Sequence, residues 1–368
     1  MSTSGAVASR PGSASGPRRA MFSGAPGAGA TSVTGRPAAA STMGGVAAGS
    51  DQPTVDVHQH LLGEPLVEAL ARRTEAPMLI RHRDSWTFRV PAEPDSVLAF
   101  EATDVSGRAA ALAEDGVDRA LVALSTALGV ESLPGDEALE LIEAHHRGLD
   151  DLPAEFGGWG AVQLEHPDPF EVDAALNRGR VGITLPAPAL ADLDSLAAVG
   201  PLLDRLEASG APLFVHPGPV GWPATGRPAP VAGATPPPVW WPALTDYVAQ
   251  MQAAWFAFLH AGRADHPRLR VLFAMLAGGA PLQLERYAAR SGSPVPDPDP
   301  LVFYDTSSYG PRMLGAMTEA VGPAQLVFGS DRPVVDPGPA GLDPDLRVAL
   351  LATNPARLFN QQPKGALA

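Results

Sequence analysis

Residues 54–63 read TVDVHQHLLG, and this stretch decides between two architectures. Its first half is a short apolar run of the kind that forms a buried parallel strand, and polar residues follow directly. An open, doubly wound sheet that binds a nucleotide usually has a glycine-rich turn after its first strand. The stretch lacks that glycine pattern, which favours a closed barrel over an open sheet.

Strand candidates alternate with helix candidates along the rest of the chain. The apolar, β-branched runs lie at residues 54–60, 119–125, 158–164, 180–187, 212–217, 270–276, 301–308 and 325–331. The segments with helical spacing lie at residues 66–73, 137–146, 196–209, 242–259, 281–290, 311–321 and 345–358. Eight strand–helix units over about 300 residues predict an α/β chain that folds as a (β/α)₈ TIM-type barrel.

Composition divides the chain into three predicted parts. Residues 1–50 are rich in Ala, Gly and Ser and contain no acidic residue, so we expect a disordered tail that buries too little apolar surface to order itself. Residues 51–360 form the predicted barrel, and residues 361–368 form a short C-terminal tail. The Arg- and Ser-rich start also resembles an organellar transit peptide, and a true start at Met21 or Met43 is a further alternative.

The charge and the rare residue types exclude several classes of function. The chain has 26 Lys and Arg against 40 Asp and Glu, a formal net charge of −14, which argues against nucleic acid or an anionic membrane as its main partner. We expect a cytoplasmic protein because no apolar run suits a membrane span or a secretory signal. Cysteine is absent, which excludes disulfides and thiolate ligands. The single lysine, Lys364, leaves the barrel without a Schiff-base or carbamate-forming lysine.

Residues of the metal-ligand type follow three of the predicted strands. His58 and His60 are two positions apart, so both side chains point to the same side of the first strand. His216 follows the fifth strand and Asp331 the eighth. In a barrel these strand ends meet around one mouth, although a polar strand end, a rim histidine or a helix cap would explain each residue alone. Three imidazoles and one carboxylate suit one divalent ion, most of all Zn²⁺.

Together these motifs resemble the amidohydrolase superfamily of metal-dependent barrels, and most of all the amidohydrolase-related branch that contains aminocarboxymuconate-semialdehyde decarboxylase. The shared motifs are DVHQH at 56–60, VHP at 215–217, GGAP at 278–281, GSDRP at 329–333 and NPARL at 354–358. The resemblance implies that His58, His60, His216 and Asp331 bind the metal and that Asp331 also transfers a proton. It also implies a small-molecule substrate and a homodimer.

One position departs from the family pattern. Members usually have a histidine at the end of the sixth strand, where residues 272–279 read LFAMLAGG and Met275 stands near that position. Methionine transfers no proton and binds hard divalent ions poorly. Hydrogen bonds inside the barrel or a surface loop are the simpler explanations for the polar residues that might take over its role, which are Asp305, Ser307, Tyr304, Thr306 and His166.

Other landmarks are assigned to the surface or to the rim. We expect four histidines on helices or helix ends to be in solvent, namely His145, His146, His260 and His266. One insertion covers residues 74–95. A second, at residues 218–241, is rich in Pro and Gly and ends in Trp240 and Trp241, which either form a lid over the mouth or pack on the barrel rim.

Three functions follow from this site. We predict first a metal-dependent hydrolase in which metal-activated water attacks an amide, ester or lactone carbonyl and Asp331 takes up the proton. The second is a decarboxylase of the same branch, which arginines at the mouth such as Arg312 or Arg332 would favour because they pair with carboxylates. The third is a barrel with weakened or absent turnover, because Met275 replaces the expected histidine.

Overall fold

The computed structural model describes residues 52–360, with short gaps. The gaps are Asp84, Ala92, Pro94, residues 221–237, Val239, Asp336, Pro337 and Ala340. Both predicted tails, at residues 1–50 and 361–368, lie outside the described residues, so their assignment stays a prediction. None of the helices that the structure describes has the length and apolar character that crossing a membrane requires.

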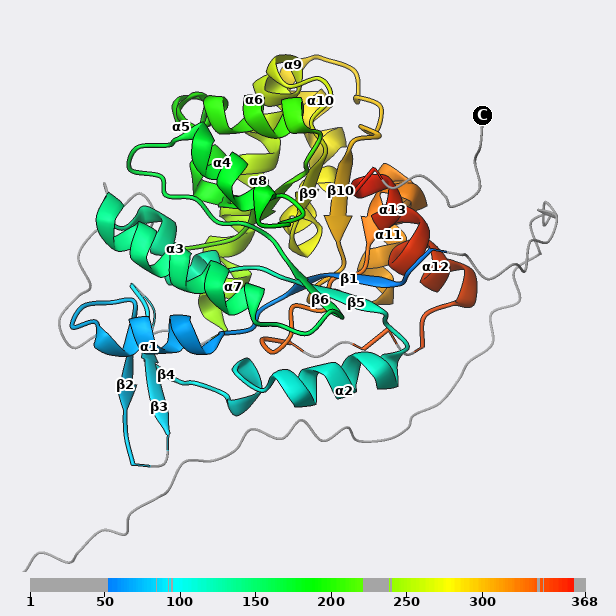
Figure 1. The fold of residues 1–368 in the computed structure, drawn as a ribbon. Coiled ribbons are helices and arrows are strands. Elements are labelled where there is room, and N and C mark those ends of the chain that lie inside the picture. The colour runs from blue at the N-terminus through cyan, green and yellow to red at the C-terminus, as the bar shows by residue number, and fades with distance from the viewer. Residues whose placement is uncertain are drawn as a thin grey trace, which may run out of the picture. The chain divides into compact units, whose positions relative to one another are not determined.

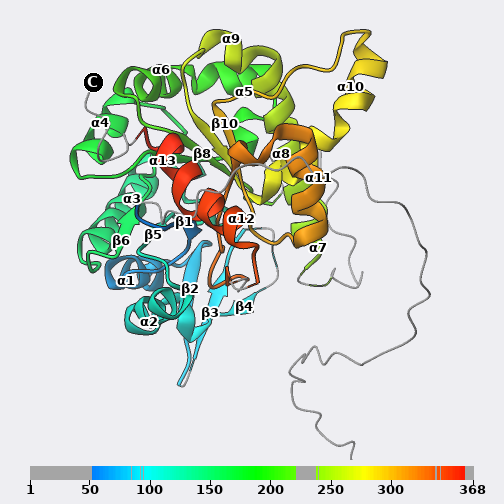
Figure 2. The same cartoon turned by 90° about the vertical axis from the view of Figure 1, so that its right-hand side faces the viewer.

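Eight parallel strands within the described residues form the barrel (Figures 1 and 2). Regular ladders join them in two sets, with the orders β1-β5-β6 and β7-β8-β9-β10-β11. The bounds are β1 Val55–Gln59, β5 Arg119–Val122, β6 Phe156–Gly158, β7 Ile183–Pro186, β8 Leu213–His216, β9 Val271–Phe273, β10 Val302–Asp305 and β11 Leu326–Val327. Their residues are almost all buried, as parallel strands covered by helices require.

Two joins between the sets complete the ring. Between β6 and β7, the Gly160 N–H donates to the Gly182 carbonyl at 2.8 Å. Between β11 and β1, the Asp331 N–H donates to the His58 carbonyl at 2.9 Å. The order of strands around the ring is therefore their order along the chain, and the predicted (β/α)₈ barrel is confirmed over the open sheet.

Each predicted strand position contains a barrel strand or touches one. The third differs most, because β6 ends at Gly158 while the prediction begins there. The apolar residues Trp159, Ala161 and Val162 are buried, but they lie mostly beyond the ladder, which continues only as a bridge from Gly160 to β7. Burial without pairing explains why the apolar pattern placed this strand too late.

Helices surround the strands (Figures 1 and 2). Their bounds are α1 Glu64–Arg72, α2 Val105–Asp115, α3 Gly135–Asp150, α4 Pro169–Asn177, α5 Leu193–Ala198, α6 Gly200–Ser209, α7 Trp241–Leu244, α8 Asp246–Ala257, α9 Arg263–Asp265, α10 Leu284–Ser291, α11 Pro311–Val321, α12 Pro344–Val348 and α13 Asn354–Leu358. The helical spacing in the sequence predicted neither α2 nor α4. Both begin with an aspartate cap, Asp104 on the Gly107 N–H and Asp168 on the Phe170 N–H, which was the available signal.

The two insertions take different forms. Residues 74–95 contribute to a small antiparallel sheet beside α1, made of β2 Met78–Arg81, β3 Trp86–Arg89 and β4 Ser96–Val97 (Figure 1). Most of residues 218–241 lies outside the described residues. Trp240 and Trp241, at the end of this insertion, are 56% and 45% exposed, so they are not buried against the barrel rim.

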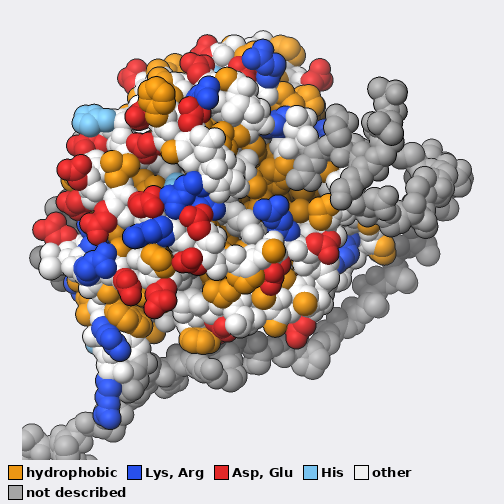
Figure 3. All heavy atoms as spheres, viewed as in Figure 1, with side chains coloured by type: hydrophobic (Ala, Val, Ile, Leu, Met, Phe, Trp, Pro, Cys, Tyr) orange, Lys and Arg blue, Asp and Glu red, His pale blue; other side chains and the backbone are white. Residues whose placement is uncertain are grey.

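On the surface, acidic and basic side chains are interspersed over the face that Figure 3 shows.

Candidate metal centre

The four predicted ligand residues meet at the carboxyl ends of three strands. One donor atom each from His58, His60, His216 and Asp331 lies within 4.8 Å of the others. His60 Nε2 is 3.1 Å from His58 Nε2 and 3.2 Å from His216 Nε2, and Asp331 Oδ1 is 3.2 Å from His60 Nε2. The three imidazoles are buried and the Asp331 side chain is 16% exposed. The structure thus brings together the residues that the sequence placed at one mouth.

The other nitrogen of each imidazole is fixed by an oxygen atom. Nδ1 of His60 and of His216 contacts a backbone carbonyl at 3.0 and 2.9 Å, and Nδ1 of His58 contacts Asp305 Oδ2 at 2.8 Å. Carbonyl and carboxylate oxygens only accept hydrogen bonds, so Nδ1 carries the hydrogen and Nε2 of the neutral ring presents a lone pair. This is the arrangement that orients metal-binding histidines in proteins.

The spacing of these lone pairs fits a small cation. Neutral nitrogens that face each other at 3.1–3.2 Å repel unless a proton or a metal ion lies between them. A tetrahedral ion with bonds of about 2.0–2.1 Å to nitrogen separates its ligands by about 3.3–3.4 Å. Asp331 Oδ1 is buried and has no hydrogen-bond partner within the described part of the chain, which leaves it available to the same ion. The donor set therefore fits one divalent metal.

The surroundings also set the charges of these groups. Burial alone lowers the pKa of His58, but the Asp305 and Asp331 carboxylates outweigh it and raise that pKa above its usual value. Burial, together with the neighbouring imidazoles, holds the pKa of His216 well below its usual range. Burial alone raises the pKa of Asp331, but His58 and His60 outweigh it and lower that pKa. The centre therefore offers an ionised carboxylate and a neutral His216 at neutral pH.

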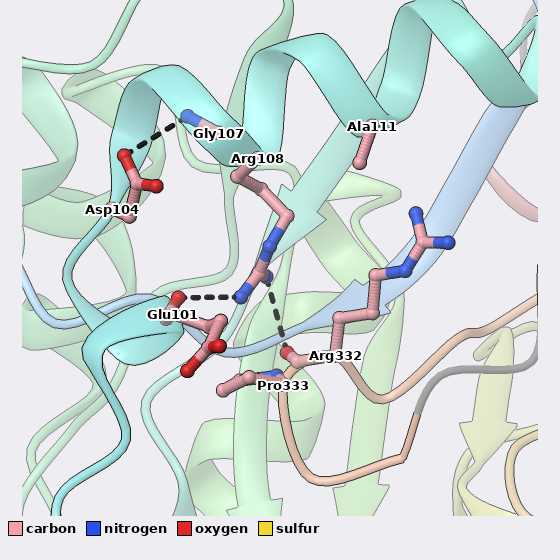
Figure 4. Close-up of a pocket in the computed structure, with 7 residues that line it drawn as sticks. All are labelled: Glu101, Asp104, Gly107, Arg108, Ala111, Arg332 and Pro333. Atoms are coloured by element: carbon pink, nitrogen blue, oxygen red, sulfur yellow. Dashed lines mark hydrogen bonds between the residues drawn. The ribbon is translucent and has the colours of Figure 1, made fainter.

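The backbone at Asp331 adopts an uncommon conformation that directs the next residue outward. Its φ is 58°, in the left-handed region that non-glycine residues rarely adopt. The guanidinium of Arg332 then binds Asp115 Oδ2 at 2.7 Å on the outside of the barrel, as its direction in Figure 4 shows. The suggestion that Arg332 meets a substrate carboxylate at the mouth is therefore wrong.

The sixth strand carries no proton-transfer side chain at the expected position. Met275 begins a left-handed run that continues to Gly279, and its N–H donates to Asp305 Oδ1 at 2.8 Å. Asp305 also accepts from the Ser307 hydroxyl at 2.6 Å, so Asp305 and Ser307 are the pair beside His58. Asp305 is a positioning group for His58 rather than a free acid or base.

Two of the other candidates point elsewhere. The Tyr304 hydroxyl accepts a hydrogen bond at 3.0 Å from the Trp255 indole of α8, away from the metal centre. His166 is exposed in the loop before α4, which agrees with the simpler explanation given for it. Thr306 is buried and lies outside the four-residue cluster.

Three of the four histidines expected in solvent are buried instead. His145, His146 and His266 are 2%, 6% and 5% exposed, whereas His260 is exposed as predicted. His145 lies one turn from both Leu141 and Leu149 on the buried face of α3, a spacing of four residues that could have revealed its position. Burial lowers the pKa of His146 to about 4, so its ring is neutral and accepts the Ala161 N–H at 3.2 Å.

The sequence analysis did not name two residues that lie around the centre, Thr126 and Arg108. The Thr126 hydroxyl lies 2.8 Å from His216 Nδ1, and Arg108 donates to the His60 carbonyl at 3.2 Å. Thr126 directly follows the strand predicted at residues 119–125, and this position was an available signal. Arg108 gave none, because it lies on a helix that the apolar pattern did not predict.

Neither protein-family profiles nor curated protein sequences give a match to this chain. Solved structures do match. The 5-carboxyvanillate decarboxylase of Sphingomonas paucimobilis is 19% identical, with 84% of this chain and 99% of that chain covered and a TM-score of 0.63. The same enzyme from Novosphingobium aromaticivorans, complexed with manganese and 4-hydroxy-3-methoxy-5-nitrobenzoic acid, is 14% identical, with 84% and 96% covered and a TM-score of 0.62.

A structure named amidohydrolase II is 18% identical, with 84% of this chain and 100% of that chain covered and a TM-score of 0.62. These likenesses extend over nearly all of the described residues, and their low identity leaves the fold as what they establish. The chain therefore shares the barrel fold of these three structures, which is the fold that its motifs predicted.

Proposed function

We propose that this chain is a metal-dependent decarboxylase of the amidohydrolase superfamily that acts on a small carboxylated molecule. The convergence of three imidazole lone pairs and one unpartnered carboxylate oxygen on one point carries the proposal. The hydrolase predicted first from the sequence becomes the second candidate, because the features below fit loss of CO₂ better than attack by water.

His58, His60, His216 and Asp331 would hold the ion. Zn²⁺ suits three nitrogens and one oxygen, and Mn²⁺, which the Novosphingobium enzyme binds, is the main alternative. When bound, the ion supplies a positive charge that holds the substrate carboxylate and stabilises the negative charge that develops as the C–C bond breaks. Asp305 would keep His58 oriented toward it.

Asp331 is the proposed proton-transfer group. It takes a proton from water and delivers it to the carbon that loses its carboxylate. The C–C bond breaks, its electron pair becomes the new C–H bond, and the released CO₂ combines with the remaining hydroxide to give bicarbonate. The partial exposure of the Asp331 side chain supports this exchange with solvent.

The decarboxylases among the fold relatives favour decarboxylation over hydrolysis for this chain. Met275 agrees with that choice, because it stands where a histidine would help Asp331 to activate an attacking water. Asp305 does not replace that histidine, because its oxygens are already occupied by His58, Met275 and Ser307. Decarboxylation needs no water to attack the substrate and uses Asp331 as its proton-transfer group.

The test compares two activities of purified, metal-loaded protein. CO₂ release from a panel of hydroxylated aromatic and unsaturated carboxylic acids is measured beside hydrolysis of lactones, esters and amides. We expect CO₂ release that requires the metal and falls at least about 100-fold in Asp331→Asn. The exposed Asp345 provides the control, and Asp345→Asn should retain full activity. Hydrolysis without CO₂ release would support the hydrolase instead, and full activity of Asp331→Asn would refute the proton-transfer role.

A further inference from the structure

We propose that Arg108 is a positioning residue for the metal centre, and that it acts by holding together the ends of β1 and β11. These two strands lead to three of the four proposed ligands. The inference rests on the proposed metal site and adds a group that lies outside the barrel wall, on α2. The experiment below is designed so that failure of the metal site and failure of this inference give different results.

The guanidinium of Arg108 reaches both strand ends at once. Its Nη1 donates to the Gln59 side-chain oxygen at 2.9 Å, to the His60 carbonyl at 3.2 Å and to the Arg332 carbonyl at 3.3 Å. His60 is a ligand, and Arg332 directly follows the ligand Asp331. Figure 4 shows the bond from Arg108 to the Arg332 carbonyl. One buried cation therefore binds the backbone on both sides of the β1–β11 join.

The carboxyl group of Asp56 continues this hydrogen-bond network into the barrel. Gln59 Nε2 donates to Asp56 Oδ2 at 2.7 Å, and Asp56 Oδ1 accepts the N–H groups of His58 at 3.2 Å and Ser330 at 3.0 Å. Ser330 directly precedes Asp331. The hydrogen-bond network of Arg108, Gln59 and Asp56 therefore contacts the backbone at or beside each ligand that β1 and β11 contribute.

Backbone hydrogen bonds join the two strand ends, and Arg108 binds one of the same groups from outside. The His60 N–H donates to the Arg332 carbonyl at 2.7 Å, and the Asp331 N–H donates to the His58 carbonyl at 2.9 Å. β11 itself has only two residues, and Asp331 adopts φ 58° beyond its end. The Arg332 carbonyl accepts a second hydrogen bond from Arg108, so the guanidinium reinforces this join directly beside Asp331.

Burial of the guanidinium supports a specific role. Arg108 is 5% exposed, at a position on α2 where an apolar residue would ordinarily cover the barrel. A buried charge is costly unless its hydrogen bonds are made, and here backbone carbonyls and an amide oxygen accept them. An apolar side chain would pack in this place without joining the two strands.

An open pocket makes the inference testable by chemical rescue. A cavity of about 500 Å³ reaches Arg108 from outside the barrel, and Glu101, Asp104, Arg332 and Pro333 are among the residues that line it. Figure 4 shows the Arg108 guanidinium among them. After Arg108→Ala, a small guanidinium compound added to the solution can enter this space and meet the same carbonyls.

The experiment measures the affinity of the full chain for Mn²⁺ and Zn²⁺ by calorimetry, without any substrate. We expect Arg108→Ala to lose about 10–100-fold in affinity, and methylguanidinium to restore part of the loss. Arg263→Ala is the matched control. Arg263 also donates to two backbone carbonyls, of His266 and Leu269 at 2.8 Å each, but it precedes β9 at the opposite end of the barrel. The Arg263→Ala variant should bind metal with the same affinity as the wild type.

A milder variant covers the case in which Arg108→Ala does not fold. Arg108→Lys keeps the charge and the stem but loses the planar fork, so it should bind metal more weakly than wild type. Amide hydrogen exchange should also be faster at residues 58–60 and 330–332, with little change elsewhere.

The outcomes separate cleanly. Wild-type affinity in Arg108→Ala or in Arg108→Lys overturns the inference while leaving the metal site in place. A loss that methylguanidinium does not restore and that Arg263→Ala shares shows a general effect on stability, which also overturns it. Absence of metal binding by the wild type refutes the proposed function itself, and this inference with it.

Discussion

A buried glutamate at the rim of the barrel should make the stability of the protein fall as the pH rises. Glu131 lies in the turn between β5 and α3 and is fully buried. Among the described residues, neither oxygen of its carboxyl group has a hydrogen-bond partner. Burial raises the pKa of Glu131 from 4.5 to about 8, so the folded chain keeps a proton that the unfolded chain has lost at neutral pH.

The sign and the size follow from linkage. Below pH 4.5 both states are protonated and the group carries no penalty. Between pH 4.5 and 8 only the unfolded chain ionises, so the free energy of unfolding falls by about 1.4 kcal/mol per pH unit, or about 5 kcal/mol in total. Above pH 8 the folded chain also ionises and the penalty stays constant.

The test is Glu131→Gln, which keeps the shape and removes the titration. Urea unfolding of the metal-free protein is followed from pH 4.5 to 8.5, and the variant should gain stability over the wild type up to about pH 8 and then stay level. Glu140→Gln, at an exposed glutamate of α3, is the control for the substitution itself. A flat difference between Glu131→Gln and the wild type would refute the reasoning, because it would show that Glu131 ionises alike in both states.

Four further predictions concern the metal centre and its surroundings. His58→Ala should remove about one equivalent of bound metal, measured by elemental analysis of purified protein. Asp305→Asn should weaken metal binding by about 10–100-fold in calorimetry, because His58 loses the carboxylate that orients it. His146 has a pKa lowered to about 4, so it stabilises the fold above pH 6.5 and this contribution, about 3 kcal/mol, is lost as the pH falls to 4. His146→Gln should flatten that part of the urea profile. Met275→His should raise lactone or ester hydrolysis above its wild-type rate in a direct assay, since it restores a proton-transfer group beside the centre.

The features that could be read from the sequence are those set by local pattern. A parallel strand buried on both faces needs a short apolar run, so the runs revealed the barrel strands and the polar residues after them revealed the strand ends. The ligands were found because they sit at those ends. Helix α2 was missed because its buried face carries Arg108 beside Leu112, which weakens the apolar stripe that marks a helix.

The groups that orient the ligands could not be read in the same way. The partner of His58 is Asp305, which lies 247 residues away, and His60 and His216 are held by backbone carbonyls that every residue type carries. Only the folded chain brings these oxygens to the rings. The burial of His145, by contrast, could have been predicted, because this residue lies four residues from both Leu141 and Leu149 on the apolar face of α3.

Asp56 belongs to the charged groups that surround the metal centre, although it is not one of the proposed ligands. It shares the DxHxH motif with His58 and His60, yet it lies outside the four-residue cluster and accepts backbone N–H groups instead. Burial raises the pKa of Asp56, and the hydrogen bonds that its carboxyl group accepts act in the opposite direction. At His58 the opposite balance holds, because the carboxylates of Asp305 and Asp331 raise its pKa against the effect of burial. These negative groups therefore favour a positive charge at the His58 ring. A metal ion held by the three imidazoles and Asp331 would supply that charge without a buried proton on the ring.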